Sequence, residues 1–215
     1  MELPRTIPLF PLPNVVLFPG LPLPLHIFEP RYREMVRDAA ASHEVIGMVL
    51  LRSDGSASAE AGPPPVFAVG CAGKIVSREP LPDGRSNILL HGVCEFRIAA
   101  EIPGRAYRRA EVEWLWRDHA SLDPGRRERL AATLRRHLQA EPESPAHKVL
   151  GDASIADEVF VNFFSYVLDF PPLEKQALLE EPTLAARADR LREIVEFHSA
   201  AGFAAGDSDA GDRFH

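Results

Sequence analysis

Few residues of this sequence have the types and spacing that catalysis or cofactor binding requires. A phosphate-binding loop ends in Gly-Lys-Ser or Gly-Lys-Thr, because backbone amides and the lysine hold phosphate while the hydroxyl holds magnesium. The nearest match, Gly73-Lys74-Ile75, lacks that hydroxyl and falls in a segment that we expect to be a strand. The sequence therefore predicts no site of this kind for nucleotide hydrolysis.

Nucleophiles and metal ligands are equally poorly placed. Ser208 lies in Gly206-Asp207-Ser208-Asp209-Ala210, which falls short of the Gly-x-Ser-x-Gly turn of serine hydrolases and follows no expected strand. No two of the eight histidines are four residues apart, and two cysteines are too few for a four-ligand zinc site without histidine help. We therefore expect no enzymatic activity, no catalytic residue, no metal and no cofactor.

Two further pairs of polar side chains are interpreted as structural. Cys71 and Cys94 fall on two strands of an expected hairpin, offset by about two positions if Asp83-Gly84 is a two-residue turn. This placement allows a disulfide but favours buried thiols. His26 and Glu29 are three residues apart and could share a hydrogen bond at the start of a helix.

Composition and charge disfavour several classes of protein. With 46% hydrophobic and 26% charged residues, the chain is globular and neither disordered nor fibrous. Residues 1–117 carry 13 basic and 13 acidic side chains, so residues 118–215 hold the whole net charge of −7. An acidic chain without a basic stripe disfavours nucleic acid. No membrane-spanning or signal segment is evident, so we expect a cytoplasmic protein without membrane contact.

The elements of the first half are predicted to be extended, with one helix. Eight prolines in the first 30 residues alternate with large apolar residues, which favours edge strands and turns because proline has no N–H donor. Pro30 can begin a helix, whose apolar face would be Tyr32, Met35, Val36, Ala39 and Ala40. Strands are expected over residues 45–51, 66–77, 87–98 and 110–116.

The second half is predicted to be helical. Leucines four apart begin a helix near Asp123, and a second apolar repeat covers residues 155–167, with Asp152 or Ser154 as candidate caps. A short helix is expected over residues 173–179, and Thr183 can cap a fourth. Residues 202–215 are small, acidic and aperiodic, as a frayed tail would be.

The proline-rich opening carries a resemblance to a known family. Ile-Pro-Leu-Phe-Pro-Leu-Pro-Asn-Val-Val-Leu-Phe-Pro at residues 7–19 and Leu-Pro-Leu-His-Ile-Phe-Glu at 23–29 resemble the start of the N-terminal domain of ATP-dependent Lon protease. Phe67-Ala68-Val69-Gly70, Leu81-Pro82-Asp83-Gly84 and the strand around Gly92 resemble later motifs in order. The helices, including residues 175–180, are similar to those that follow, so the resemblance spans roughly residues 5–200.

The resemblance implies an α+β fold: a PUA-like β pseudo-barrel followed by a helical bundle. We place the barrel domain at residues 1–117, the helical subdomain at 118–201 and a flexible acidic tail at 202–215. In the protease, such a domain recognises unfolded or degron-bearing polypeptide. Since the sequence stops where the ATPase and peptidase would begin, we expect a non-catalytic module that binds unfolded or extended polypeptide.

Residues near the strand-to-helix junction are the candidates for polypeptide binding. A client could add a strand to an open sheet edge or place side chains in an apolar groove. Each candidate also fits the barrel core. The candidates are Phe18, Leu21, Leu23, Phe28 and Tyr32.

Three other functions stay open at this point. A small-molecule pocket, or a remnant enzyme that uses one, is compatible with a fold that hosts different sites. RNA binding is an alternative by analogy with PUA-like folds, and Arg105, Arg108 and Arg109 form a local basic cluster. The acidic helical half could also dock a separate partner protein while the other half holds a client.

Overall fold

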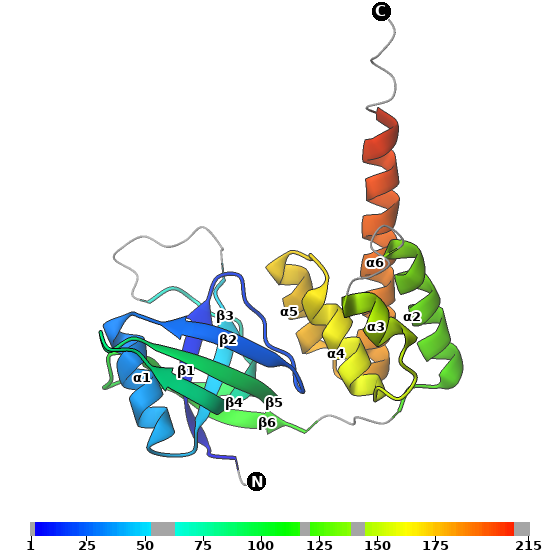
Figure 1. Cartoon of the computed structure of the whole chain (residues 1–215). Coiled ribbons are helices and arrows are strands. Elements are labelled where there is room, and N and C mark those ends of the chain that lie inside the picture. The colour runs from blue at the N-terminus through cyan, green and yellow to red at the C-terminus, as the bar shows by residue number, and fades with distance from the viewer. Residues whose placement is uncertain (1–2, 53–62, 117–120, 139–144, 209–215) are drawn as a thin grey trace, which may run out of the picture. The chain divides into compact units, whose positions relative to one another are not determined.

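The computed structural model describes residues 3–52, 63–116, 121–138 and 145–208, which form helices and strands of an α+β fold (Figure 1). The chain divides into two compact units. The first takes in Met1–Trp116 and Asp169–Glu180, and the second Arg117–Leu168 and Glu181–His215. The domain boundaries expected from the sequence stay a proposal. In the structure, residues 169–180 belong to the same unit as the strands.

The first unit is built on one sheet that closes on itself. Its strand order is β2-β5-β4-β3-β1-β6, and β6 also pairs with β5, which closes a ring of five strands with β2 outside it. The predicted α+β fold with a β pseudo-barrel is therefore confirmed. The strands are β1 (Thr6–Leu12), β2 (Pro22–Ile27), β3 (Val45–Leu50), β4 (Val69–Pro80), β5 (Ser86–Ile102) and β6 (Arg108–Leu115).

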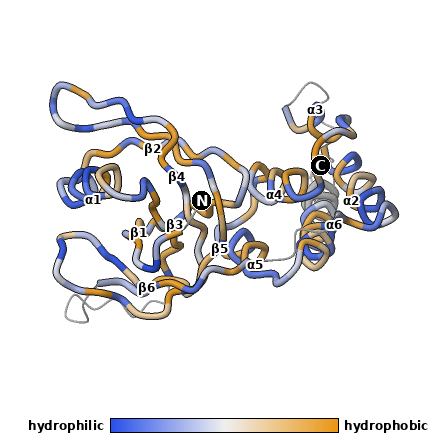
Figure 2. The backbone as a smooth tube through the Cα atoms, turned by 90° about the horizontal axis from the view of Figure 1, so that it is seen from below, coloured by the Kyte–Doolittle hydropathy of each residue, from blue (hydrophilic) through white to orange (hydrophobic). Residues whose placement is uncertain are grey.

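Apolar side chains fill the barrel. Residues at alternate positions of the strands point inward, as the period of two in an extended chain requires. Helix α1 (Pro30–Ala40) contacts β1 and β3, and hydrophilic and hydrophobic residues alternate around it (Figure 2). The buried residues of the barrel core are Ile7, Leu9, Val45, Val49, Ala72, Phe96, Ala110 and Val112.

The turn between β4 and β5 differs from the predicted two-residue turn. The Leu81 carbonyl accepts a hydrogen bond from the Gly84 amide at 2.9 Å, and the Leu81 amide donates to Arg85. Gly84 has φ +81°, whereas Asp83 does not have a positive φ. The predicted turn is wrong because Pro82 holds a negative φ at the first turn position, so a third residue is needed to reverse the chain.

The register of β4 and β5 decides the state of the two cysteines. Cys71 lies opposite Glu95, and Cys94 lies opposite Ala72. Since neighbouring residues of a strand point to opposite faces, the two thiols lie on different faces of the sheet. Both are buried and neither forms a disulfide.

Helix α5 (Pro172–Glu180), predicted at residues 173–179, packs on β4 of the first unit. The buried Gln176 amide donates a hydrogen bond to the Val69 carbonyl at 3.0 Å. A side-chain amide that satisfies a buried backbone acceptor in this way ties α5 to the barrel.

The second unit consists of helices α2 (Pro124–His137), α3 (Pro145–Gly151), α4 (Asp157–Val167) and α6 (Leu184–Ser208). Thr183 caps α6, as predicted, and Asp123, near which a helix was predicted to begin, caps α2. The predicted cap of α4 is wrong: Ala156 occupies that position, and the Asp152 carboxylate accepts from Ser154 instead. Helix α3 was not predicted, and α6 continues into the expected tail, of which residues 209–215 lie outside the described residues.

No helix in the described ranges combines the length and the apolar character needed to cross a membrane.

A close backbone approach joins the proline-rich opening to β5. The Gly20 amide donates to the Gly92 carbonyl, and the Gly92 amide donates to the Leu21 carbonyl, both at 2.9 Å. A Cβ atom on Gly92 would lie 2.1 Å from the Phe18 carbonyl oxygen. Since the obstacle is backbone and cannot rotate away, no side chain fits at this position.

We therefore expect Gly92→Ala to lower the free energy of unfolding by about 3 kcal/mol, the upper range for overpacking. Denaturant unfolding followed by far-UV circular dichroism reports both units, because each contains helices. Gly151→Ala is the control, since a Cβ there meets nothing within 4 Å. Equal stability of the two variants would contradict the role of Gly92.

Candidate functional site

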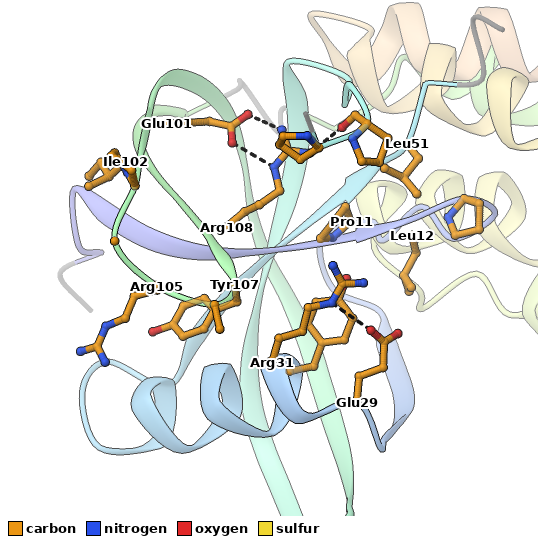
Figure 3. Close-up of a pocket in the computed structure, with 17 residues that line it drawn as sticks. Pro11, Leu12, Glu29, Arg31, Leu51, Glu101, Ile102, Arg105, Tyr107 and Arg108 are labelled. Carbon is orange, nitrogen blue, oxygen red and sulfur yellow. Dashed lines mark hydrogen bonds and ion pairs between the residues drawn. The ribbon is translucent and has the colours of Figure 1, made fainter. Parts of the chain in front are cut away.

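The first unit contains a cavity of about 660 Å³ beside the barrel (Figure 3). Three structural parts form most of its wall: the end of β1, the start of α1, and the connection from β5 to β6. Gly104, with φ +99°, allows the chain to reverse in that connection. The cavity is thus positioned by segments that are distant in sequence.

Half-buried apolar side chains and prolines make up much of the cavity wall. Leu12, Leu51 and Ile102 each leave part of their surface open to it. Such surface can be covered by an apolar group of a ligand, which gains about 25 cal/mol per Å². The prolines of the wall are Pro11, Pro13, Pro63, Pro64 and Pro103.

The charged groups of the wall are paired with one another. Arg31 Nε lies 2.9 Å from Glu29 Oε2 (Figure 3). Arg108 binds the Glu101 carboxylate and also donates to the Pro64 carbonyl at 2.7 Å. Arg105 lies 3.4 Å from Asp38. Guanidinium and carboxylate groups therefore alternate around the cavity, with no large excess of either charge.

This pairing changes the interpretation of the basic cluster in the sequence. Arg105 and Arg108 are in ion pairs, and Arg109 donates to the Pro103 carbonyl at 3.0 Å. Phosphate binding requires cations whose charge is not already compensated. The three arginines thus hold the β5–β6 connection in place and do not form an open basic patch.

Two tyrosines line the cavity. The Tyr107 hydroxyl donates to Asp38 Oδ2 at 2.8 Å, and burial followed by this hydrogen bond raises its pKa to about 12. Tyr32 packs on Phe10 with ring centroids 4.3 Å apart, and the Arg31 guanidinium lies 4.5 Å above its ring. Burial also raises the pKa of Tyr32. Both side chains are therefore neutral at pH 7.

The arrangement suits binding better than proton transfer. A neutral tyrosine whose pKa is raised does not act as a base near pH 7. Within the described residues there is no group of three or more His, Cys, Asp or Glu side chains that could hold a metal ion. The cavity offers apolar surface, aromatic rings and paired charges, which are the features of a binding site.

Prolines also occupy the free edges of the sheet. β2 pairs with β5 alone and carries Pro22 and Pro24. The end of β1 that extends beyond its pairing with β6 carries Pro11, next to the cavity. A strand that adds to an edge needs backbone N–H donors, which proline lacks. Of the two binding modes considered from the sequence, the structure therefore favours a groove over strand addition.

The predicted binding residues fall in different environments. Phe18, Leu21 and Leu23 are buried in the core of the first unit, whereas Phe28 is 59% exposed. Tyr32 lines the cavity. The binding roles of all five stay a proposal: Phe28 is open to a ligand, whereas Tyr32 is only 6% exposed at the cavity wall.

His26 and Glu29 do not share the predicted hydrogen bond. His26 lies on β2, where its Nδ1 is 2.8 Å from Asn87 Oδ1 of β5. Glu29 instead binds Arg31. The prediction is wrong because the extended backbone before α1 carries the two side chains apart, whereas spacing by three brings residues together only within a helix.

Sequence reasoning missed most of the cavity. Ile102, Tyr107 and Arg108 come from the β5–β6 connection, about 70 residues after α1 in the sequence. The turn signal Pro103-Gly104 between two predicted strands was available, but it does not show which other segment the turn contacts. Closure of the barrel brings the two segments together.

A family model matches residues 6–196 of this chain, described as the ATP-dependent protease La (LON) substrate-binding domain. The Lon protease of Cytophaga hutchinsonii is 26% identical over 200 residues, and that of Roseiflexus castenholzii is 28% identical over 200 residues. Each match covers 91% of this chain and 24% of the relative. The chain thus spans about a quarter of the length of the curated relatives it matches.

Two solved structures are similar in fold. The crystal structure of a Lon N-terminal domain protein from Xanthomonas campestris is 25% identical with a TM-score of 0.64, covering 86% of this chain and 96% of that one. The N-terminal domain of the Mycobacterium avium complex Lon protease has a TM-score of 0.70 at 16% identity, covering 90% of this chain and 100% of that one. The second likeness bears on the fold alone.

The hydrogen bond of Tyr107 gives a testable pH dependence. We expect Tyr107→Phe to lower the free energy of unfolding by about 1 kcal/mol at pH 8. Because the pKa rises from 10 in the unfolded chain to about 12 in the folded one, this contribution is complete below pH 10. It is lost as the pH rises through 12.

Denaturant unfolding of both proteins between pH 8 and pH 12 measures the effect. Tyr32→Phe is the control for the hydrogen bond at pH 8, because no described residue forms a hydrogen bond with the Tyr32 hydroxyl. A difference between wild type and Tyr107→Phe that grows above pH 10 would contradict the assignment.

Proposed function

Because this chain belongs to the family of LON substrate-binding domains, we propose that its cavity beside the barrel binds an extended polypeptide segment. The observation that carries the proposal is the wall itself. Apolar surface, tyrosine rings and paired charges are gathered around about 660 Å³ at the surface of one unit. Unfolded or extended polypeptides are the class of client.

The wall matches the chemistry of an extended chain. Apolar side chains of the client can cover Leu12, Leu51 and Ile102, while the largely buried Tyr32 offers only a small part of its ring. An extended backbone presents N–H and C=O groups in alternation, and the carboxylates and guanidiniums of the rim can accept from and donate to them. Because these groups recur in any sequence, the site is suited to clients that share little sequence similarity.

The proposed activity is binding without catalysis. Support comes from the described residues, in which no nucleophile is paired with a base at the cavity and both tyrosines are neutral at pH 7. The Lon-type relatives are about four times longer than the matched region, and their activity is not assigned to this chain. The proposal also includes a separate partner protein that docks on the acidic helical half.

A small-molecule site is the second candidate. The volume of the cavity favours it, since pockets for small ligands measure roughly 300 to 1,000 Å³. The filled interior of the barrel excludes such a ligand from the barrel axis. Peptide length distinguishes the candidates: affinity that rises from tripeptides to decapeptides supports an extended client, whereas equal affinity supports a compact ligand.

We expect Ile102→Glu to weaken binding of a labelled, reduced and carboxymethylated model polypeptide at least tenfold. The substitution places a charge in apolar surface that the client would cover, and tenfold corresponds to about 1.4 kcal/mol. Fluorescence anisotropy titration measures the dissociation constant.

The control is Val76→Glu, because Val76 is 54% exposed on β4 and does not line the cavity. Circular dichroism melting establishes that both variants are folded. Unchanged affinity of folded Ile102→Glu, or an equal loss in Val76→Glu, would place binding elsewhere and overturn the proposal for this cavity.

A further inference from the structure

A second cavity, of about 430 Å³, is formed by α1 and the hairpin of β4 and β5. It shares no lining residue with the first cavity. Arg33 and Arg37 come from consecutive turns of α1, and Arg78 and Arg85 come from the two sides of the hairpin. Four exposed arginines from two elements thus line one open cavity.

Most of this positive charge is uncompensated. Arg85 is paired with Asp83, whose carboxylate lies 2.6 Å from its Nε. Arg33, Arg37 and Arg78 form no ion pair with any residue of the described ranges. Glu34 also lines the cavity, but its carboxylate lies 3.6 Å from Arg105. At least three positive charges therefore remain available to a ligand.

One of the four arginines lies directly against the hairpin. Arg33 lies against the hairpin turn, where a Cβ on Gly84 would be 2.0 Å from its Nη2. Pro30 and Pro80 form rigid parts of the wall. Like charges gathered in this way repel one another, and an anion that binds among them relieves that repulsion.

The choice of arginine is not itself evidence, since 21 of the 24 basic residues of the chain are Arg. An anion site is indicated instead by the convergence of four arginines with few acidic residues beside them. Each guanidinium can form two parallel hydrogen bonds with a phosphoryl group. Two pairs of guanidiniums on facing elements match two linked phosphoryl groups.

We propose that this cavity binds a diphosphate group, either free or at the end of a small molecule. No aromatic side chain is among its described lining residues, so a nucleobase would find no stacking surface. The same absence argues against a single-stranded RNA, which stacks its bases on aromatic side chains. The proposal does not depend on the peptide site.

Isothermal titration calorimetry at low salt tests the site with pyrophosphate, ADP, inorganic phosphate and a single-stranded RNA oligonucleotide. We expect saturable binding of pyrophosphate and ADP with similar affinity, and at least tenfold weaker binding of phosphate. If pyrophosphate binds distinctly more tightly than ADP, the ligand is the free anion. If ADP binds more tightly, the ligand is a small molecule that ends in a diphosphate. No saturable binding of either at millimolar concentration, or tighter binding of RNA, would overturn the proposal.

Substitutions locate the binding. Arg33→Gln with Arg78→Gln should weaken pyrophosphate binding about a hundredfold, at about tenfold for each charged hydrogen-bond donor. Arg97→Gln is the matched control, because Arg97 is an exposed arginine of β5 outside the cavity. If the double variant has a lowered melting temperature, Arg37→Gln alone replaces it and is expected to weaken pyrophosphate binding tenfold. Equal affinity of the variants and wild type, or an equal loss in Arg97→Gln, would refute the site.

Discussion

The first unit depends on one strand, β5, which changes its hydrogen-bonding partner along one of its two edges. One edge of this 17-residue strand pairs with β4. The other edge pairs with β2 as far as His91 and with β6 from Glu95 onward. The exchange of partners occurs around Gly92, where the backbone of the proline-rich opening passes closest. Without this change of partner, β6 would pair with β1 alone and the sheet would stay open.

Both cavities follow from this arrangement. β5 begins with Ser86 at the second cavity, which is lined by four arginines, and ends with Ile102 at the first cavity, which is lined by prolines. Helix α1 contributes to both cavities. Their electrostatics differ because the first cavity pairs its arginines with nearby carboxylates, whereas the second leaves three guanidiniums unpaired within the described residues. The two cavities are therefore suited to different ligands, an extended chain of low net charge and a compact anion.

Local rules predicted the elements well where one segment determines its own conformation. The helix after Pro30, the strands, a helix that begins near Asp123 and the cap at Thr183 were predicted. Proline geometry, apolar periodicity and side-chain capping act within a few residues. Errors arose where competing local structures were close in energy. The Asp152 carboxylate bonds to Ser154 and does not cap α4, and Pro82 selects a longer turn than Asp-Gly alone would.

The sequence by itself determined the family, the α+β class and the elements, because these depend on residue types at short spacing. The binding roles of its candidate residues stay a proposal: Tyr32 lines the cavity, while Phe18 lies in the core. Only the tertiary structure brought the β5–β6 connection to α1, gathered four arginines at the hairpin and placed α5 on β4. These contacts depend on strand register and barrel closure, which join residues far apart in the chain and leave no periodic signal in it.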